Sequence, residues 1–154
     1  MGFGEIASAA IMFIAVTSAA TLLAFVFNNY ANSASASIST RQTFMNEQLK
    51  SDITIENVLY DVTSQQVKVY VRNTGQSAMK INYTSAFIAN ERVDFSSAAA
   101  SIEVISDTDT VNTGIWDSKE TVLITSNQSI TPGVTHTVAI ITQYGVKDEY
   151  EFSI

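Results

Sequence analysis

The sequence contains no cysteine, one proline and one histidine among its 154 residues. Without cysteine the chain cannot form a disulfide framework, a thiolate metal site or a cysteine nucleophile. Charge is also scarce, because only 15% of the residues are charged, and 8 basic residues stand against 15 acidic ones. This acidic balance argues against a nucleic-acid partner, which requires a basic surface. The hydrophobic share of 46% argues against a disordered chain.

Charge is absent from one long segment near the start of the chain. The run Ile6–Phe27 holds 22 residues without a charge, a glycine or a proline. As a helix it would be about 33 Å long, enough to cross a hydrocarbon core of about 30 Å. The run is longer than the apolar part of a signal peptide, and no basic residue precedes it. We therefore predict a retained helix in a membrane or a filament core, with small residues that favour close helix contacts.

The next segment, residues 28–50, is polar but also lacks proline and glycine. A narrow apolar stripe recurs in it at multiples of three or four residues, at Tyr30, Ala34, Ile38, Met45 and Leu49. This spacing favours one continuous helix from about Glu5 to Lys50, a stalk beyond the apolar part; a flexible Ser/Ala tether is the alternative. The residues expected to anchor or pack the helix are Glu5, Ile6, Ile11, Phe13, Leu22 and Phe25.

The rest of the chain predicts strands. Val67, Val69 and Val71 alternate with polar or larger residues, a period of two that places the valines on one face. Similar short runs, separated by turn signals, are Ile53–Tyr60, Met79–Thr84, Ser101–Ile105, Glu120–Thr125, Val134–Gln143 and Val146–Ile154. About seven strands without intervening helices predict an immunoglobulin-like antiparallel sandwich. The predicted class is α+β: a hydrophobic transmembrane helix (1–27), a helical stalk (28–50) and a β-sandwich (51–154).

No motif for catalysis, cofactor binding or metal binding is present. His136 is expected on the solvent side of its strand, with no nearby partner that would make it a catalyst. The run Asp107-Thr108-Asp109-Thr110 resembles half of a calcium loop, but the glycine and closing glutamate of that motif are missing. Asp117, Glu120 and the acids near the end of the chain show no acid–base spacing. These observations predict a protein that is not an enzyme and carries no cofactor.

Two complete sequons begin at Asn82 and Asn127. In an extracytoplasmic protein these asparagines would be N-glycosylation acceptors on the surface. Together with the absence of cysteine and the many Ser and Thr residues, they favour a location outside the cell for the sandwich. The positive-inside rule leans slightly the other way, because Arg41 and Lys50 follow the apolar run, at a distance that weakens the argument.

A short N-terminus with Glu5, an apolar helix, a stalk and a β-sandwich is the plan of type IV pilin-like proteins. Within that group the sequence resembles the archaellum stator family, of the FlaF/FlaG type. The resemblance rests on Met1-Gly2-Phe3 directly before the apolar helix without a preceding leader, and on the segment 48–55 that enters the first strand. It rests also on Val69-Tyr70-Val71-Arg72-Asn73-Thr74-Gly75, and on Gly114-Ile115-Trp116 followed by Glu120-Thr121-Val122.

The resemblance implies a non-enzymatic archaeal motility protein, anchored in the cytoplasmic membrane through residues 6–27 with its sandwich outside. It implies surface-layer protein and other archaellum components as partners, and a dimer through the sandwich. The strand Val146–Ile154 is one candidate docking edge.

The alternative is a filament-forming archaellin or adhesive pilin, a homo-oligomer whose helix packs in a filament core and whose Glu5 pairs with a neighbour's amino terminus. Archaellin precursors usually carry a basic residue and glycine before their cleavage point, whereas only Met1 precedes Gly2 here. If Met1 is the mature first residue, the filament interpretation gains. A third interpretation, an anchored lectin or sensor domain, predicts a concave site lined by aromatic or carboxylate groups.

Overall fold

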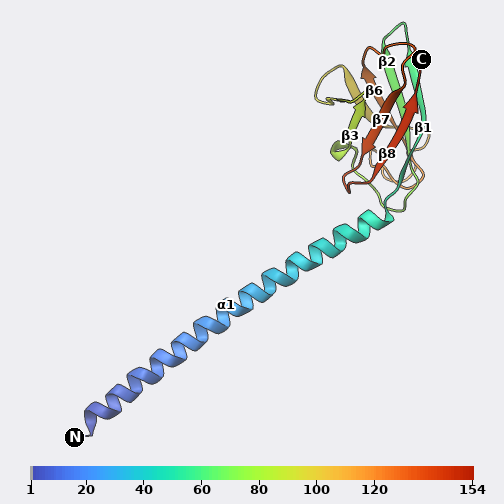
Figure 1. Ribbon diagram of the computed structural model, residues 1–154. Coiled ribbons are helices and arrows are strands. Elements are labelled where there is room, and N and C mark those ends of the chain that lie inside the picture. Colours follow the sequence, from blue (N-terminus) through green and yellow to red (C-terminus); the bar gives the residue numbers. More distant parts are fainter. Residues whose placement is uncertain (1) are drawn as a thin grey trace. The chain divides into compact units, whose positions relative to one another are not determined.

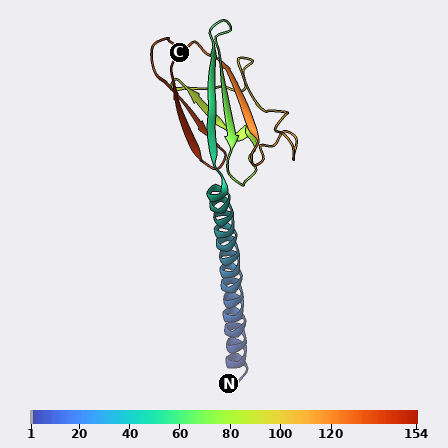
Figure 2. The same ribbon diagram turned by 90° about the vertical axis from the view of Figure 1, so that its right-hand side faces the viewer.

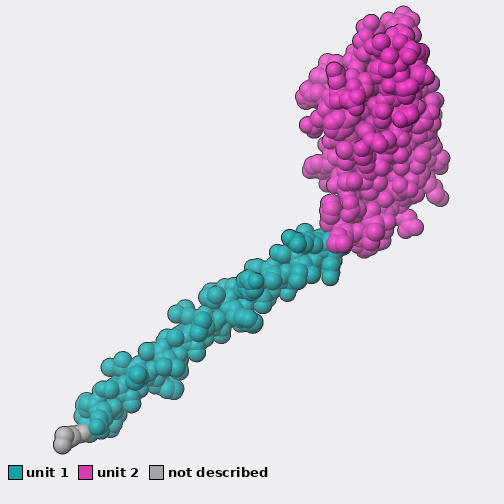
Figure 3. All heavy atoms as spheres, in the orientation of Figure 1, with its two compact units in different colours: residues 1–43 teal, residues 44–154 magenta. Residues whose placement is uncertain are grey.

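The structure is a computed structural model that describes residues 2–154, so the question of whether Met1 is the mature N-terminus lies outside the described residues. It divides into two compact units, Met1–Thr43 and Phe44–Ile154 (Figure 3). One helix, α1 (Phe3–Lys50), fills the first unit and continues into the second. No glycine or proline interrupts it beyond Gly4, which is why nothing stops it before Lys50. The continuous helix is therefore confirmed, and the flexible tether is wrong.

The second unit contains two four-stranded sheets in which every strand pair is antiparallel (Figure 1). The first sheet has the order β1 (Ile53–Asp61), β2 (Gln66–Asn73), β6 (Thr121–Asn127), β5 (Ala100–Val104). The second has the order β4 (Glu91–Arg92), β3 (Ser85–Ile88), β7 (His136–Ile141), β8 (Lys147–Phe152). The predicted α+β plan of a long helix followed by antiparallel sheets is confirmed. The immunoglobulin-like topology and the boundaries at 27 and 50 stay predictions.

The alternation in β2 places its valines in the core, as predicted. Val67, Val69 and Val71 are completely buried, while Lys68 and Tyr70 between them are half-buried on the outer face. Inward-facing residues of both sheets form one hydrophobic cluster, which includes Ile88 and Ile140 of the second sheet. Because the side chains of a strand alternate between faces, one buried layer holds the two sheets together. Figure 2 shows the strands of the sandwich from a second side.

Two strand predictions differ from the structure. The run Met79–Thr84 is not a strand: Met79 forms only an isolated bridge to Trp116, and a 3-10 turn, η1 (Ile81–Tyr83), follows. Trp116 and Met79 are both almost completely buried, so this bridge closes one end of the core instead of extending a sheet. The short strands β3 and β4 were not predicted, because four and two residues are too few for a period of two to be visible.

The two lateral sides of the sandwich differ. On one side β1 lies beside β8 (Figure 1), where a bulge between Ile55 and Asn57 interrupts the pairing of β1 with β2. The Ile55 amide donates to the Asp148 carboxylate of β8 at 2.7 Å. A side chain of one sheet thus satisfies the backbone of the other on this side. On the opposite side β5 is the last strand of its sheet.

Candidate functional site: the apolar helix and the junction loop

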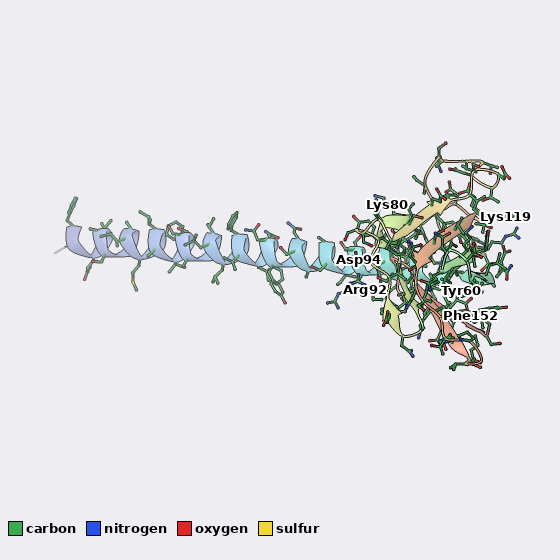
Figure 4. The ribbon with its side chains drawn as sticks, turned by 90° about the horizontal axis from the view of Figure 1, so that it is seen from above. Tyr60, Lys80, Arg92, Asp94, Lys119 and Phe152 are labelled. Carbon is green, nitrogen blue, oxygen red and sulfur yellow. The ribbon has the colours of Figure 1, made fainter. Side chains whose placement is uncertain are left out.

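The first half of α1 has the surface of a helix that needs an apolar environment. None of the residues of α1 is buried, and Ile6, Ile11, Phe13, Leu22 and Phe25 are each more than three-fifths exposed. Side chains project from both visible sides of the helix along its length (Figure 4). Within the described chain, α1 is the helix whose length and composition suffice to cross a membrane. The predicted anchor residues are therefore available to lipid or to other helices.

Three of the four hydroxyl side chains between Ile6 and Phe27 are hydrogen-bonded within the helix. The hydroxyls of Ser8, Thr17 and Thr21 donate to the carbonyls of Gly4, Phe13 and Thr17, at 2.8 to 2.9 Å. In an apolar medium an unsatisfied hydroxyl is costly, and such back-bonding to the preceding turn removes that cost. Glu5 has no ion-pair partner among residues 2–154. Its carboxylate is exposed in the first turn, where the helix dipole favours a negative charge.

The predicted stripe on the second half of α1 does not pack on the described chain. Tyr30, Ile38, Met45 and Leu49 remain 57 to 85% exposed. Phe44, which lies outside the stripe and is the first residue of the second unit, packs within that unit, with its ring edge-on to Tyr144 at a centroid distance of 5.9 Å. The stripe is therefore free to contact another helix.

The C-terminal end of α1 is capped by the segment Asn73–Ser77, which we call the junction loop. The Lys50 carbonyl accepts from the Gln76 amide at 2.7 Å, and the Glu47 carbonyl accepts from the hydroxyls of Ser51 and Ser77. The last carbonyls of a helix have no partner within it, so these bonds supply partners that water would otherwise provide. The end of α1 is thus hydrogen-bonded to the start of the sandwich.

Gly75 permits this close approach. A Cβ at this position would lie 2.6 Å from the Lys50 carbonyl oxygen and closer still to the Asp52 nitrogen. Both are backbone atoms and cannot rotate away. The amides of Thr74 and Gly75 donate to the Asp52 carbonyl at 3.1 and 3.0 Å, which holds the loop against the chain entering β1. The glycine is required for space here, since it does not have a positive φ.

Asn73 organises the junction loop from inside. It is fully buried, and its side-chain amide donates to the carbonyls of Ser77 and Trp116 at 2.9 and 3.1 Å. Its side-chain oxygen accepts from the Gly75 amide at 3.0 Å. Each polar atom of this buried side chain therefore has a partner. The Asn-Thr-Gly motif, part of a segment on which the resemblance to the stator family rests, also positions the helix end.

The acidic residues between β5 and β6 hold a loop through hydrogen bonds. Glu120 is 1% exposed, and its two carboxylate oxygens accept from the amides of Thr110 and Asp117 at 2.9 and 2.8 Å. Asp109 accepts from Gly114, and Asp117 accepts from Asn112. Residues 2–154 contain no group of three His, Cys, Asp or Glu residues placed to hold a metal ion. The acids act as local acceptors for backbone N–H groups.

His136 differs from its prediction. It is half-buried instead of facing solvent, with Nε2 3.0 Å from the Thr131 carbonyl and its ring 5.9 Å from that of Phe152. The prediction was wrong because His136 shares the parity of the buried Val138, and alternate residues of a strand lie on the same face. Within the described chain its partners are a carbonyl and an aromatic ring, which is not the arrangement of a catalytic base.

Both sequon asparagines are exposed. Asn82 lies in η1, and Asn127 ends β6, where its side-chain oxygen accepts from Gln66 Nε2 at 3.1 Å. The two sites lie on different elements and no contact joins them to the acidic loop. The structure therefore places the predicted glycosylation sites on the surface of the sandwich and the anchor residues on α1.

A long apolar helix followed by an antiparallel sandwich is the pilin-like plan. The family described as archaeal-type flagellin matches residues 2–152, and the chain belongs to that family. A comparison with curated protein sequences finds no match.

Three solved structures share the fold. The archaellum periplasmic stator protein FlaG from Sulfolobus acidocaldarius is 15% identical, with a TM-score of 0.53 over 66% of this chain and 99% of that chain. A chain of the FlaF and FlaG stator complex from the same organism is 18% identical, with a TM-score of 0.51 over 65% of this chain and 87% of its own. The archaeal flagellum of Methanospirillum hungatei strain JF1 is 14% identical, with a TM-score of 0.65 over 96% of this chain and 92% of that chain.

These findings confirm the predicted relationship to archaellum proteins. The family and the three similar structures are structural proteins of the archaellum, not enzymes. A match over 96% of the chain has to include most of α1, whereas matches of 65 to 66% leave a segment of about its length unmatched. The match to the archaeal flagellum therefore extends along the helix.

Proposed function

We propose that the protein is a membrane-anchored stator component of the archaellum, whose sandwich lies outside the cytoplasmic membrane and binds the surface-layer lattice. The observation that carries the proposal is the change in the surface of α1 near Asn28. Before this residue the helix is apolar all round for 22 residues, and after it the surface is polar except for a narrow stripe. About 33 Å of apolar helix matches the thickness of a bilayer core.

The polar half of α1 is suited to an aqueous environment beyond the membrane. Asn28, Asn29 and Asn32 are exposed and follow the apolar segment directly, and Arg41 is the first charge after Glu5. A helix packed on all sides along its whole length would instead stay apolar all round. The polar half suits a spacer that holds the sandwich away from the bilayer.

The junction loop is suited to a protein that transmits mechanical force. A stator has to transmit force between its anchor and its bound partner, and a flexible tether would absorb that force. Here the helix end is fixed by the Gln76–Lys50 hydrogen bond and by the packing of Phe44 on Tyr144. Both contacts lie within the second unit, so the sandwich and the last turns of the helix fold together.

A filament subunit is the second candidate, favoured by two observations. The match to the archaeal flagellum extends over 96% of the chain. The apolar side chains Ile38, Met45 and Leu49 are exposed in the single chain, and neighbouring helices of a filament core would cover them. In that assembly Glu5 would pair with a cation of an adjacent copy.

Disulfide crosslinking of the helix separates the two candidates. The chain has no cysteine, so the double variant Ala19→Cys/Ser35→Cys carries two thiols, one in the apolar half and one in the polar half of the helix. One thiol can join only one neighbour, so the single variants Ala19→Cys and Ser35→Cys are controls that give no product larger than a dimer. Oxidation of native membranes that hold the double variant should also stop at a dimer for a stator component. A ladder of higher oligomers from the double variant, together with this chain as the major band of purified surface filaments, would reject the stator role.

Binding to the surface layer requires its own measurement. Full-length protein in nanodiscs should bind purified surface-layer lattice, with Lys68→Glu on the outer face of the first sheet as a control for non-specific attraction. Failure to bind, with the protein still a minor membrane species, would remove the surface layer as partner and leave the anchored role intact.

We further propose that Asn82 and Asn127 carry N-linked glycans, since both side chains are exposed. Intact mass spectrometry of the protein from its native membrane should show a glycan mass that Asn82→Gln and Asn127→Gln each reduce. A mass equal to that of the bare polypeptide contradicts this proposal. A glycan at either site would also fix the sandwich outside the cell, because the two sequons lie beyond the apolar segment.

A further inference from the structure

The outer edge of β5 presents backbone groups that the described chain leaves unpaired. The Ile105 amide donates to Thr121, and the Asn127 amide donates to Ala99. Hydrogen-bonded and non-hydrogen-bonded pairs alternate in an antiparallel ladder. Ile102 and Val104, opposite Ile124 and Val122, are therefore non-hydrogen-bonded pairs. Their N–H and C=O groups point away from β6, and no hydrogen bond to them occurs among residues 2–154.

Two grooves flank this edge. A groove of about 480 Å³ lies beside η1 and is lined by Ile81, Phe95 and Ile102 together with an asparagine, an alanine and two serines. A second groove of about 300 Å³ lies on the outer face of the sheet, where Tyr70, Leu123 and Glu103 line it. The side chains of an added strand would alternate between these two grooves, because successive residues of a strand point to opposite faces.

The charge at the edge indicates what the added strand carries. Glu103 is exposed and forms no ion pair within the described residues. The groove beside η1 is lined by no charged residue. A complementary strand would place apolar side chains toward Ile81 and Phe95, and a basic side chain opposite Glu103.

The opposite side of the sandwich lacks this combination. The outward face of β8 carries Lys147, Glu149 and Glu151, and β1 lies beside the strand. Charged side chains on an edge are a common means of preventing strand addition. The Asp148 carboxylate also links β8 to the Ile55 amide. Of β5 and β8, β5 is the better acceptor, although the sequence had suggested Val146–Ile154.

We propose that the outer edge of β5 is a docking site for an extended strand of a partner protein, apolar at alternate positions and basic opposite Glu103. The inference applies to an anchored stator component and to a filament subunit alike, and so goes beyond the proposed function. Only another polypeptide backbone supplies donors and acceptors in the alternating order that Ile102 and Val104 present.

The test uses full-length protein in detergent micelles and a synthetic nine-residue peptide in which valine alternates with lysine or threonine. The control peptide has the same sequence but carries N-methyl groups on alternate amides, which removes its donors. The amides of Ile102 and Val104 should exchange with deuterium rapidly in the free protein. Saturating peptide should slow both at least tenfold, and the N-methylated peptide should leave them unchanged.

Two proline variants locate the edge. Ile102→Pro removes an N–H that points outward and makes no bond to β6. Glu149→Pro is the matched control on β8, because the Thr142–Val146 bond places Glu149 in a non-hydrogen-bonded pair. We expect Ile102→Pro to weaken peptide binding at least tenfold and Glu149→Pro to leave it unchanged. Equal loss in both variants would overturn the assignment to β5.

Glu103→Lys keeps the test valid if Ile102→Pro fails to fold, since Glu103 is exposed. This variant should bind the lysine peptide at least threefold more weakly and regain affinity for a peptide with glutamate in place of lysine. Unchanged exchange of Ile102 and Val104 at about 1 mM peptide overturns the proposal. Protection that rises with protein concentration in the absence of peptide would identify a second copy as the occupant, and overturns it as well.

Discussion

The two units of the chain differ in where their hydrophobic side chains lie. The described residues of the first unit are helical from Phe3 onward and none is buried, although the segment before Asn28 is apolar all round. In the second unit the valines of β2 are completely buried together with Trp116. The sandwich therefore supplies its own apolar environment, whereas the helix depends on one from outside. The average hydropathy of the sequence therefore combines two different needs: a buried core for the sandwich and an apolar environment around the helix.

The largest loss of stability is expected when a charge enters the core of the sandwich. Val69→Asp should cost more than about 3 kcal/mol, because an unpaired carboxylate would replace a completely buried side chain. Thermal unfolding followed by near-ultraviolet circular dichroism measures the effect. Lys68→Asp, on the adjacent outer face, should have a small effect. An unchanged melting temperature for Val69→Asp would show that this face is not core.

The corresponding change in the helix should affect insertion and leave the sandwich folded. Phe13→Asp is expected to disfavour the membrane by about 2.5–3.5 kcal/mol, the cost of an aspartate near the centre of a spanning helix. Carbonate extraction of membranes should then release a larger share of the variant. Ser35→Asp, in the polar half, should remain with the wild type. Equal release of the two variants would contradict the boundary near Asn28.

A smaller effect is expected at the junction loop, where the end of the helix packs against the sandwich. Gly75→Ala should destabilise the sandwich by about 1–3 kcal/mol, since the added Cβ would overlap backbone atoms of Lys50 and Asp52. Gly4→Ala is the control, because nothing lies within 4 Å of that position. Both are read by the melting temperature of the full chain. Equal temperatures would mean that the helix end does not pack against the loop.

The smallest effect is expected in the turn between β1 and β2. Hydrogen bonds from the Ser64 side chain, and then from the amides of Thr63 and Ser64, lower the pKa of the exposed Asp61 below 3.8. A pKa lowered by folding stabilises the protein above the unfolded value, and that contribution is lost as the pH falls through the folded value. The melting temperatures of wild type and Asp61→Asn should therefore differ slightly at pH 7 and converge below pH 3.8. A constant difference at every pH would contradict this.

Local patterns in the sequence predicted the elements that need no distant partner. The absence of helix breakers between Glu5 and Lys50 predicted α1, and the period of two predicted the buried face of β2. The parity of His136 was misjudged, although Val138 two residues later gave the signal. The turn η1 could not be distinguished from a strand, because Met79 and Ile81 also alternate with polar residues.

The sequence by itself determined an apolar helix of membrane length and an antiparallel sandwich, because both follow from composition and periodicity along the chain. Only the tertiary structure decided what Asn73, Gly75 and Glu120 do. Their partners lie on other segments, such as the Lys50 carbonyl beside Gly75 and the Thr110 amide that donates to Glu120. It also decided which edge is open, because strand order depends on pairings between residues far apart in sequence, which no local pattern encodes.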